Sequence, residues 1–253
     1  MRPRLRRLQE TIRRRSTAPA STVSPEPEHP FAELAEIDRR DSELIRRVIA
    51  WSLAPGSCCI DVGAHGGSVL TEMVRVAPRG RHIAYEPLPH LAEYLRTTFP
   101  DVDVRCAAVS DHEGEESFAR VRAAEAWSGL VFRPLPGNVE PDVEEIAVRV
   151  EALDDALPAD FVPALVKIDV EGGEEGVLRG ALRTLREHRP TVIFEHGYGA
   201  ANAYGTEPDD VYGLLVDDAG LRVFDLDGDG PYSLAEFRRA YFSSERVNWV
   251  AHA

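Results

Sequence analysis

The fold class is decided by the stretch Cys58-Cys59-Ile60-Asp61-Val62-Gly63-Ala64-His65-Gly66-Gly67. A short apolar run leads into a glycine-rich turn, and a helical pattern follows from Val69. Because glycine has no Cβ atom, such a turn lets backbone N–H groups come close to a ligand. The stretch therefore predicts a buried strand, a binding turn and a helix, as in nucleotide-binding α/β sheets.

A second apolar run, His82-Ile83-Ala84-Tyr85, ends at Glu86. An acidic residue at the end of this strand can accept hydrogen bonds from the hydroxyl groups of a ribose. The glycine turn and this carboxylate together predict a cofactor that contains adenosine.

The spacing of the glycines indicates which adenosine cofactor is expected. Dinucleotide sites use the pattern G-x-G-x-x-G, which seats a pyrophosphate on the helix N-terminus. Here Asp61 stands where that pattern has its first glycine. A carboxylate at this position would repel a pyrophosphate but suits the ammonium group of S-adenosylmethionine (SAM). SAM is therefore favoured over a nicotinamide dinucleotide, and a nicotinamide oxidoreductase remains the weaker alternative.

Composition and length fit one globular α/β domain. The chain has 253 residues, of which 43% are hydrophobic and 28% charged. No apolar stretch approaches the roughly 20 residues that cross a bilayer, so stable membrane insertion is not expected. The three cysteines, Cys58, Cys59 and Cys106, have neither disulfide nor metal-ligand spacing. This cysteine usage favours a cytoplasmic location.

The charge is unevenly distributed along the chain. The formal net charge is −14, although residues 1–16 contain seven arginines. An acidic body disfavours nucleic acid as a partner, because phosphate binding needs a basic face. We expect residues 1–30 to form a disordered Arg-rich tail with a Pro/Ser-rich linker, and residues 31–253 to form the domain.

Helical and strand patterns alternate through the domain, which predicts a mostly parallel sheet with helices on both faces. Residues 115–150 interrupt the alternation with β-like pieces at Glu116–Val121, Leu130–Phe132 and Ile146–Val150, separated by turn residues at Pro134, Pro136 and Pro141. We expect an inserted hairpin or lid there. The strands predicted for the main sheet are Cys58–Val62, His82–Tyr85, Val102–Val109, Ala164–Val170, Thr191–Glu195, Leu221–Leu226 and Val247–Ala251. The predicted helices are Phe31–Leu53, Val69–Ala77, Leu88–Thr98, Glu174–Glu187, Asp209–Ala219 and Leu234–Tyr241.

Ligands of such sheets bind outside the carboxyl ends of the strands. The residues at those ends are therefore expected to meet around one crevice: Asp61, Glu86, Ser110, Asp169, Glu195 and His196.

Several blocks of the chain resemble the FkbM-type methyltransferases. The most specific runs from Leu165 to Glu174 (LVKIDVEGGE), and the others include the glycine turn, Tyr85-Glu86-Pro87 and Ile193-Phe194-Glu195. The resemblance covers Trp51 to Val250. It implies a Rossmann-like class I methyltransferase fold, with seven mostly parallel strands and the last strand antiparallel. It also implies SAM-dependent methyl transfer to a hydroxyl of a small molecule or sugar, in natural-product or polysaccharide tailoring.

The resemblance also implies roles for individual residues. Asp61, Gly63, Ala64, His65 and Gly66 would line the methionine portion of SAM, although His65 stands where the family more often has Asn. Glu86 would hold the ribose with Pro87 beside it, and Ala108, Val109 and Ser110 would approach the adenine. Asp169 and Glu171 would face the transferred methyl group and the acceptor.

A hydroxyl acceptor also needs a base. His196 directly follows the fifth strand, and its imidazole suits that role. Asp169 and Glu171 compete for it, and a purely structural role for His196 stays open. Asp169, Glu195 and His196 could also ligate a divalent metal, as in some related methyltransferases. Because that ligand set is incomplete, no metal site is predicted.

The segment Asp225–Glu236 matches the twelve positions of an EF-hand calcium loop, with acids at positions 1, 3, 5 and 12 and glycine at position 6. A strand-like run precedes it where an EF-hand has a helix. The favoured interpretation is therefore a surface loop that caps the helix Leu234–Tyr241.

Three properties stay open at the level of sequence. N-methylation of a small molecule and a non-catalytic SAM-binding module are the alternatives to O-methylation. The acceptor cannot be identified, since fold does not fix function. A homo-oligomer is neither indicated nor excluded.

Overall fold

The computed structural model describes residues 32–122, 124–133, 142–244 and 246–253. The chain divides into two units, residues 1–40 and 41–253. Of the first unit, only the beginning of helix α2 (Ala32–Ser52) is described. The predicted tail at residues 1–30 lies outside the described residues, so the proposed domain division stays a prediction.

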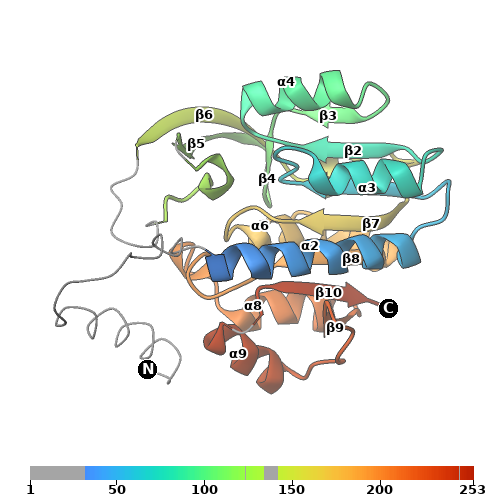
Figure 1. The fold of residues 1–253 in the computed structure, drawn as a ribbon, viewed down its shortest axis with the longest axis vertical. Coiled ribbons are helices and arrows are strands. Elements are labelled where there is room, and N and C mark those ends of the chain that lie inside the picture. Colours follow the sequence, from blue (N-terminus) through green and yellow to red (C-terminus); the bar gives the residue numbers. More distant parts are fainter. Residues whose placement is uncertain (1–31, 123, 134–141, 245) are drawn as a thin grey trace, which may run out of the picture. The chain divides into compact units, whose positions relative to one another are not determined.

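A seven-stranded sheet forms the centre of this unit (Figure 1). Neighbouring strands run parallel except β10, which is antiparallel to both β8 and β9. The prediction of a mostly parallel sheet whose last strand is antiparallel is confirmed. In spatial order the strands are β3 (Asp103–Arg105), β2 (His82–Tyr85), β1 (Cys58–Val62), β7 (Pro163–Ile168), β8 (Thr191–Glu195), β10 (Asn248–His252) and β9 (Arg222–Asp225).

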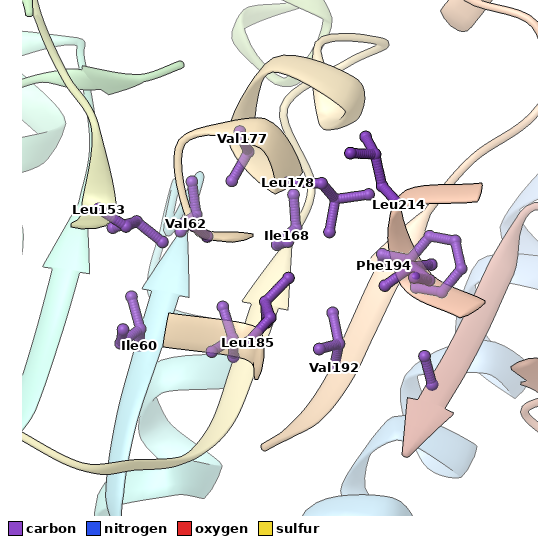
Figure 2. Close-up of a cluster of buried hydrophobic side chains, with 14 of the residues drawn as sticks. Ile60, Val62, Leu153, Ile168, Val177, Leu178, Leu185, Val192, Phe194 and Leu214 are labelled. Atoms are coloured by element: carbon purple, nitrogen blue, oxygen red, sulfur yellow. The ribbon is translucent and has the colours of Figure 1, made fainter. Parts of the chain in front are cut away.

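Helices cover both faces of the sheet because alternate residues of each buried strand point to opposite faces. Figure 2 shows one face, where Ile60, Ile168 and Phe194 pack against Leu178 of α6 and Leu214 of η3. On the other face, apolar residues of α2, α3 and α4 pack against the alternate strand positions. The remaining helices are α3 (Ser68–Val76), α4 (Pro89–Thr98), α5 (Leu153–Ala156), α6 (Glu174–Arg179), α7 (Leu182–His188), α8 (Pro208–Tyr212), the π-helix η3 (Gly213–Asp218), α9 (Leu234–Ser243) and the 3-10 helices η1 (Glu125–Trp127) and η2 (Ala201–Ala203).

The predicted strand Val102–Val109 is two strands. β3 belongs to the main sheet, whereas β4 (Ala108–Val109) joins a second sheet, in which β6 (Val143–Glu151) lies between β4 and β5 (Gly114–Val121). The pairing partner changes at this point: the N–H of Glu86 donates to the carbonyl of Arg105, and the N–H of Ser110 donates to Glu151. The chain thus leaves the edge of the main sheet, which no local sequence pattern indicates.

The predicted helix Glu174–Glu187 is also divided, into α6 and α7. Gly180 lies at the division, and a Cβ atom on it would lie 2.0 Å from the carbonyl oxygen of Ser110. The close contact between the backbones of Gly180 and Ser110 lies where α6 ends and α7 begins. The apolar periodicity that runs through both helices therefore predicted one helix where the structure has two.

The insertion contains a long hairpin, in which β5 (Gly114–Val121) pairs antiparallel with β6 (Val143–Glu151). The β-like piece at Leu130–Phe132 forms no strand, although an isolated bridge joins Gly129 to Ala119. The predicted turns at Pro134, Pro136 and Pro141 lie outside the described residues.

The EF-hand-like loop caps helix α9, which is the interpretation that the sequence favoured over a calcium site. Ser233 and Glu236 form a capping box, in which the Ser233 N–H donates to Glu236 at 2.9 Å. Arg246 pairs with Asp225 at 2.7 Å and with Asp227 at 3.2 Å. Three of the four acidic positions of the loop are therefore engaged: Asp225 and Asp227 with a guanidinium, and Glu236 with the helix cap.

Candidate active site

A cavity of about 210 Å³ lies at the carboxyl ends of the central strands. The glycine turn after β1, the end of β2 and the loop after β7 form its floor and walls, and residues of the insertion complete it. The lining residues are Val62, Gly63, Ala64, His65, Ser68, Val69, Tyr85, Glu86, Pro87, Leu88, Ala107, Ala108, Val109, Phe118, Glu125, Ala126, Ser128, Leu130, Lys167, Asp169, Val170, Glu171, Gly173 and Tyr204.

The glycine turn touches the loop after β7. Gly63 has φ +76°, and a Cβ atom on it would lie 1.9 Å from the carbonyl oxygen of Asp169. Any side chain at this position would separate the two segments. The glycine is therefore required for the close approach of the glycine turn to the segment that carries Asp169.

Glu86 lies at the end of β2 and joins that strand to the glycine turn. Its carboxylate accepts hydrogen bonds from the backbone N–H of His65 at 2.8 Å and of Leu88 at 2.9 Å. Burial raises the pKa of Glu86, and the two amide donors partly oppose the shift. Each carboxylate oxygen can accept a further hydrogen bond, so the group is suited to a ribose diol.

Lys167 is buried in β7 beneath the turn. Its Nζ atom donates to the carbonyl oxygen of Gly63 at 2.7 Å and lies 3.4 Å from carboxylate oxygens of both Asp61 and Asp169. Burial disfavours its charge, but Asp169 and Asp61 outweigh that effect and raise the pKa of Lys167. The ammonium therefore stays charged and bridges two carboxylates.

Asp169 and Glu195 form a pair of carboxyl groups at the ends of β7 and β8. Burial works against the charge of Asp169, but Lys167 and a hydrogen bond from Glu195 lower its pKa. Burial and the neighbouring Asp169 raise the pKa of Glu195 well above its usual value. The proton of this pair therefore resides on Glu195, and Asp169 is the ionised member.

Glu171 is paired with a residue of the insertion. Its carboxylate contacts the guanidinium of Arg133, whose side chain is 12% exposed. The same guanidinium lies 4.0 Å from the centre of the Trp127 ring, a cation–π contact. Arg133 therefore links the insertion to the loop that follows β7.

Carboxylate oxygens of Asp169, Glu171 and Glu195 lie within 4.8 Å of one another. Such a group could hold a divalent ion. It differs from the set considered from sequence, because Glu171 takes the place of His196. Arg133 already supplies a positive charge beside Glu171, so the arrangement does not depend on a metal for charge balance.

Most of the predicted site residues line the cavity. Those that do are Gly63, Ala64, His65, Glu86, Pro87, Ala108, Val109, Asp169 and Glu171. Five predicted residues do not line it: Asp61, Gly66, Ser110, Glu195 and His196. Asp61 is fully buried against Lys167, and Ser110 lies against Gly176 and Gly180 of the α6 segment.

His196 lies away from the cavity, between the rings of Phe237 and Tyr241. It is 1% exposed, and neither ring nitrogen has a hydrogen-bond partner among the described residues. Burial lowers its pKa to about 4, so the imidazole is neutral. This histidine therefore occupies a packed position outside the cavity lining.

Sequence reasoning missed Tyr204, which lines the cavity. The phenol oxygen of Tyr204 accepts a hydrogen bond from the Val131 N–H at 3.1 Å. Its ring also packs against Gly172 and Gly173 in the loop after β7. The segment around Tyr204 has no motif, so no sequence signal pointed to it. Residues 115–150 were expected to form an inserted hairpin or lid, and Ser128 and Leu130 of this insertion do line the cavity.

The strand order, the antiparallel β10 and a glycine turn beside an acidic strand end define a Rossmann-like class I methyltransferase fold. Residues 61–223 match the family model described as the methyltransferase FkbM domain. This match spans more than half of the chain. The chain therefore belongs to the FkbM methyltransferase family.

Solved structures show more distant likenesses. Methyltransferase FkbM from Methylobacillus flagellatus has 16% identity and a TM-score of 0.49, and the alignment covers 79% of this chain but only 44% of that protein. The plantazolicin methyltransferase BpumL, in complex with SAH, has 9% identity and a TM-score of 0.47, with 88% and 90% covered. A TehB-like SAM-dependent methyltransferase from Corynebacterium glutamicum has 13% identity and a TM-score of 0.45, with 87% and 94% covered. A search of curated protein sequences found no significant match. The assignment of the fold rests on the strand order.

Proposed function

We propose that this protein transfers a methyl group from SAM to a hydroxyl of a small molecule or sugar. The observation that carries the proposal is the position of Asp169. Its carboxylate lines the same cavity as the glycine turn and is kept ionised by Lys167. A cofactor turn and an available base thus border the same cavity.

The residues around the cavity fit SAM. The backbone at Gly63–His65 would surround the methionine portion, and Glu86 would accept the ribose hydroxyls. Leu88, Ala108 and Val109 offer an apolar wall for the adenine ring. The cofactor supplies the methyl group on an activated sulfonium, so the protein's task is to orient the acceptor and take up a proton.

We assign the base to Asp169. Hydroxyl acceptors lose a proton during methylation, and a carboxylate beside the acceptor oxygen can receive it. Glu171 lines the same cavity, but its carboxylate is paired with Arg133. His196 is not assigned this role because it lies outside the cavity. The acceptor proton would pass to Asp169, with Glu195 beside it as its hydrogen-bonding partner.

Asp169→Asn tests the proposal. The substitution keeps the shape and removes the charge, so we expect SAM affinity within about 10-fold of the wild type and methyl transfer lower by about 10²–10⁴-fold. Asp160→Asn, at an exposed aspartate (side chain 77% exposed), is the matched control and should leave both unchanged. Full activity of Asp169→Asn would contradict the assignment of the base.

Two further properties belong to the proposal. We propose catalysis without a metal, and a chelator added to the same assay should leave the rate unchanged. We also propose a cytoplasmic location, supported by three free cysteines, of which Cys59 is buried. Among the described helices, none has the length and apolar character needed to pass through a bilayer.

A further inference from the structure

Lys167 is the only lysine among the 29 lysines and arginines of the chain. Every other basic position of the sequence has arginine, including the positions that form surface ion pairs. Arginine is thus the default cation of this chain, and the exception lies in the wall of the candidate active site. Such an exception indicates a position at which a guanidinium does not meet the requirement.

The surroundings of Lys167 explain the exception. The residue is 6% exposed and is aligned with Asp61 across the β1–β7 pair. Around one Nζ atom lie the Gly63 carbonyl at 2.7 Å, the Val62 carbonyl at 3.4 Å and two carboxylates at 3.4 Å. An ammonium is compact and directs three donors to separate acceptors, whereas a guanidinium is a planar fork. The compact ammonium of lysine fits among these acceptors, and the planar guanidinium of arginine does not.

The contacts join two functional segments. Gly63 belongs to the cofactor turn, and Asp169 is the assigned base. Asp61 is 0% exposed and takes no part in the cavity lining, so it serves as the counter-ion that holds the ammonium in place. The Asp61 carboxylate, the Lys167 ammonium and the Asp169 carboxylate therefore follow one another from the interior of the sheet to the wall of the cavity.

We propose that Lys167 is a positioning residue, which holds the Gly63 carbonyl and the Asp169 carboxylate in fixed relation across the cavity. The inference deepens the proposed function and rests on it. A lysine that only neutralises Asp61 would leave the cofactor turn and the base independent of its side chain. A positioning lysine makes both depend on it.

The test compares three variants by calorimetric titration with SAM and by methyl transfer. Lys167→Met removes the ammonium. Lys167→Met with Asp61→Asn also removes the buried carboxylate charge that would otherwise be left without its counter-ion, so this double variant is more certain to fold. Lys167→Arg with Arg79→Lys exchanges the lysine with an exposed arginine and keeps the composition constant. Arg79→Lys alone is the matched control.

We expect all three Lys167 variants to bind SAM at least about 10-fold more weakly. Methionine removes the charge-assisted hydrogen bond to the turn, and the planar guanidinium of arginine does not fit the arrangement of acceptors around Nζ. Methyl transfer at saturating SAM should fall by about a further 10-fold, because the ammonium no longer holds the Asp169 carboxylate in place. The control Arg79→Lys should match the wild type in both measurements.

A second readout uses the single lysine directly. Protein labelled with ¹⁵N-lysine gives one side-chain ammonium signal, which should shift when SAM is added. In the exchanged variant, the signal comes from an exposed position and should not shift.

Wild-type SAM affinity and activity in folded Lys167→Arg with Arg79→Lys would overturn the positioning role alone. An ammonium signal that SAM does not move, in wild type that binds SAM, would do the same. Failure of the wild type to bind SAM would overturn the proposed function and the inference together.

Discussion

The carboxylate of Glu86 accepts a 2.8 Å hydrogen bond from the backbone N–H of His65. The residue expected to hold the ribose thus also fixes the glycine turn, from a neighbouring strand. His65 has φ +45°, a conformation that few residues other than glycine adopt readily. Glu86, at the end of β2, therefore helps to stabilise the glycine turn that follows β1.

Glu86→Ala should weaken SAM binding by about 10–100-fold, because hydrogen bonds to a charged group contribute about 1.5–3 kcal/mol. The measurement is calorimetric titration. Glu93→Gln on helix α4 changes an exposed glutamate (side chain 73% exposed) and is the control. Equal SAM affinity in Glu86→Ala and wild type would rule out the ribose role.

His196→Phe should retain methyl transfer within about 3-fold and should not lower stability. Phenylalanine can preserve the stacking with Phe237 and Tyr241, and it removes two buried nitrogens that lack partners among the described residues. Activity is compared with Asp169→Asn in the same assay, and stability by urea unfolding. A loss of methyl-transfer activity in His196→Phe as large as that in Asp169→Asn would indicate that His196, and not only Asp169, is needed as a base.

Glu174 gives the stability a pH dependence. Burial raises its pKa to about 7 from 4.5, and its carboxylate accepts hydrogen bonds from the N–H groups of Gly172 and Val170. Between these values the folded state holds a proton that the unfolded state has lost. Its stabilising effect is therefore complete below pH 4.5 and is lost as the pH rises through about 7.

Glu174→Gln should remove this dependence, since Gln stays neutral and can still accept the backbone hydrogen bonds. Relative to the wild type, the variant should gain up to about 3 kcal/mol of unfolding free energy between pH 5 and pH 8. Urea unfolding at several pH values measures it. A difference between the two proteins that stays constant with pH would contradict the raised pKa.

Calcium should not change the thermal midpoint of unfolding. Arg246 already pairs with Asp225 and Asp227, and Glu236 caps helix α9. Differential scanning calorimetry with millimolar calcium and with a chelator measures the effect. A clear increase with calcium that Asp227→Asn abolishes would show that the loop is a calcium site.

The sequence was most informative where local pattern and fold coincide. The bounds of β1, β2 and β8 were predicted correctly because each is a short apolar run that ends at a turn or an acid. The division of Val102–Val109 and the break at Gly180 were missed. Both arise from contacts between segments far apart in the chain, which periodicity does not contain.

The site shows the same limit. Residues carried by motifs, such as Glu86 and Asp169, line the cavity, and their roles toward SAM stay predictions. Asp61 was expected to line the methionine portion of SAM; in the structure it is fully buried, pairs in register with Lys167 and lies 3.4 Å from its Nζ atom. Tyr204 and Arg133 reach the site region through tertiary contacts from segments without a motif.

Methyl transfer from SAM labelled with ¹³C in its methyl group tests the central claim most directly. The protein is incubated with labelled SAM and with a panel of sugars and hydroxylated small molecules or a cell extract, and products are examined by mass spectrometry and NMR. We predict a product with one labelled methyl group bonded to oxygen, absent with Asp169→Asn. A label on nitrogen or carbon, or no transfer by a protein that binds SAM, would contradict the account.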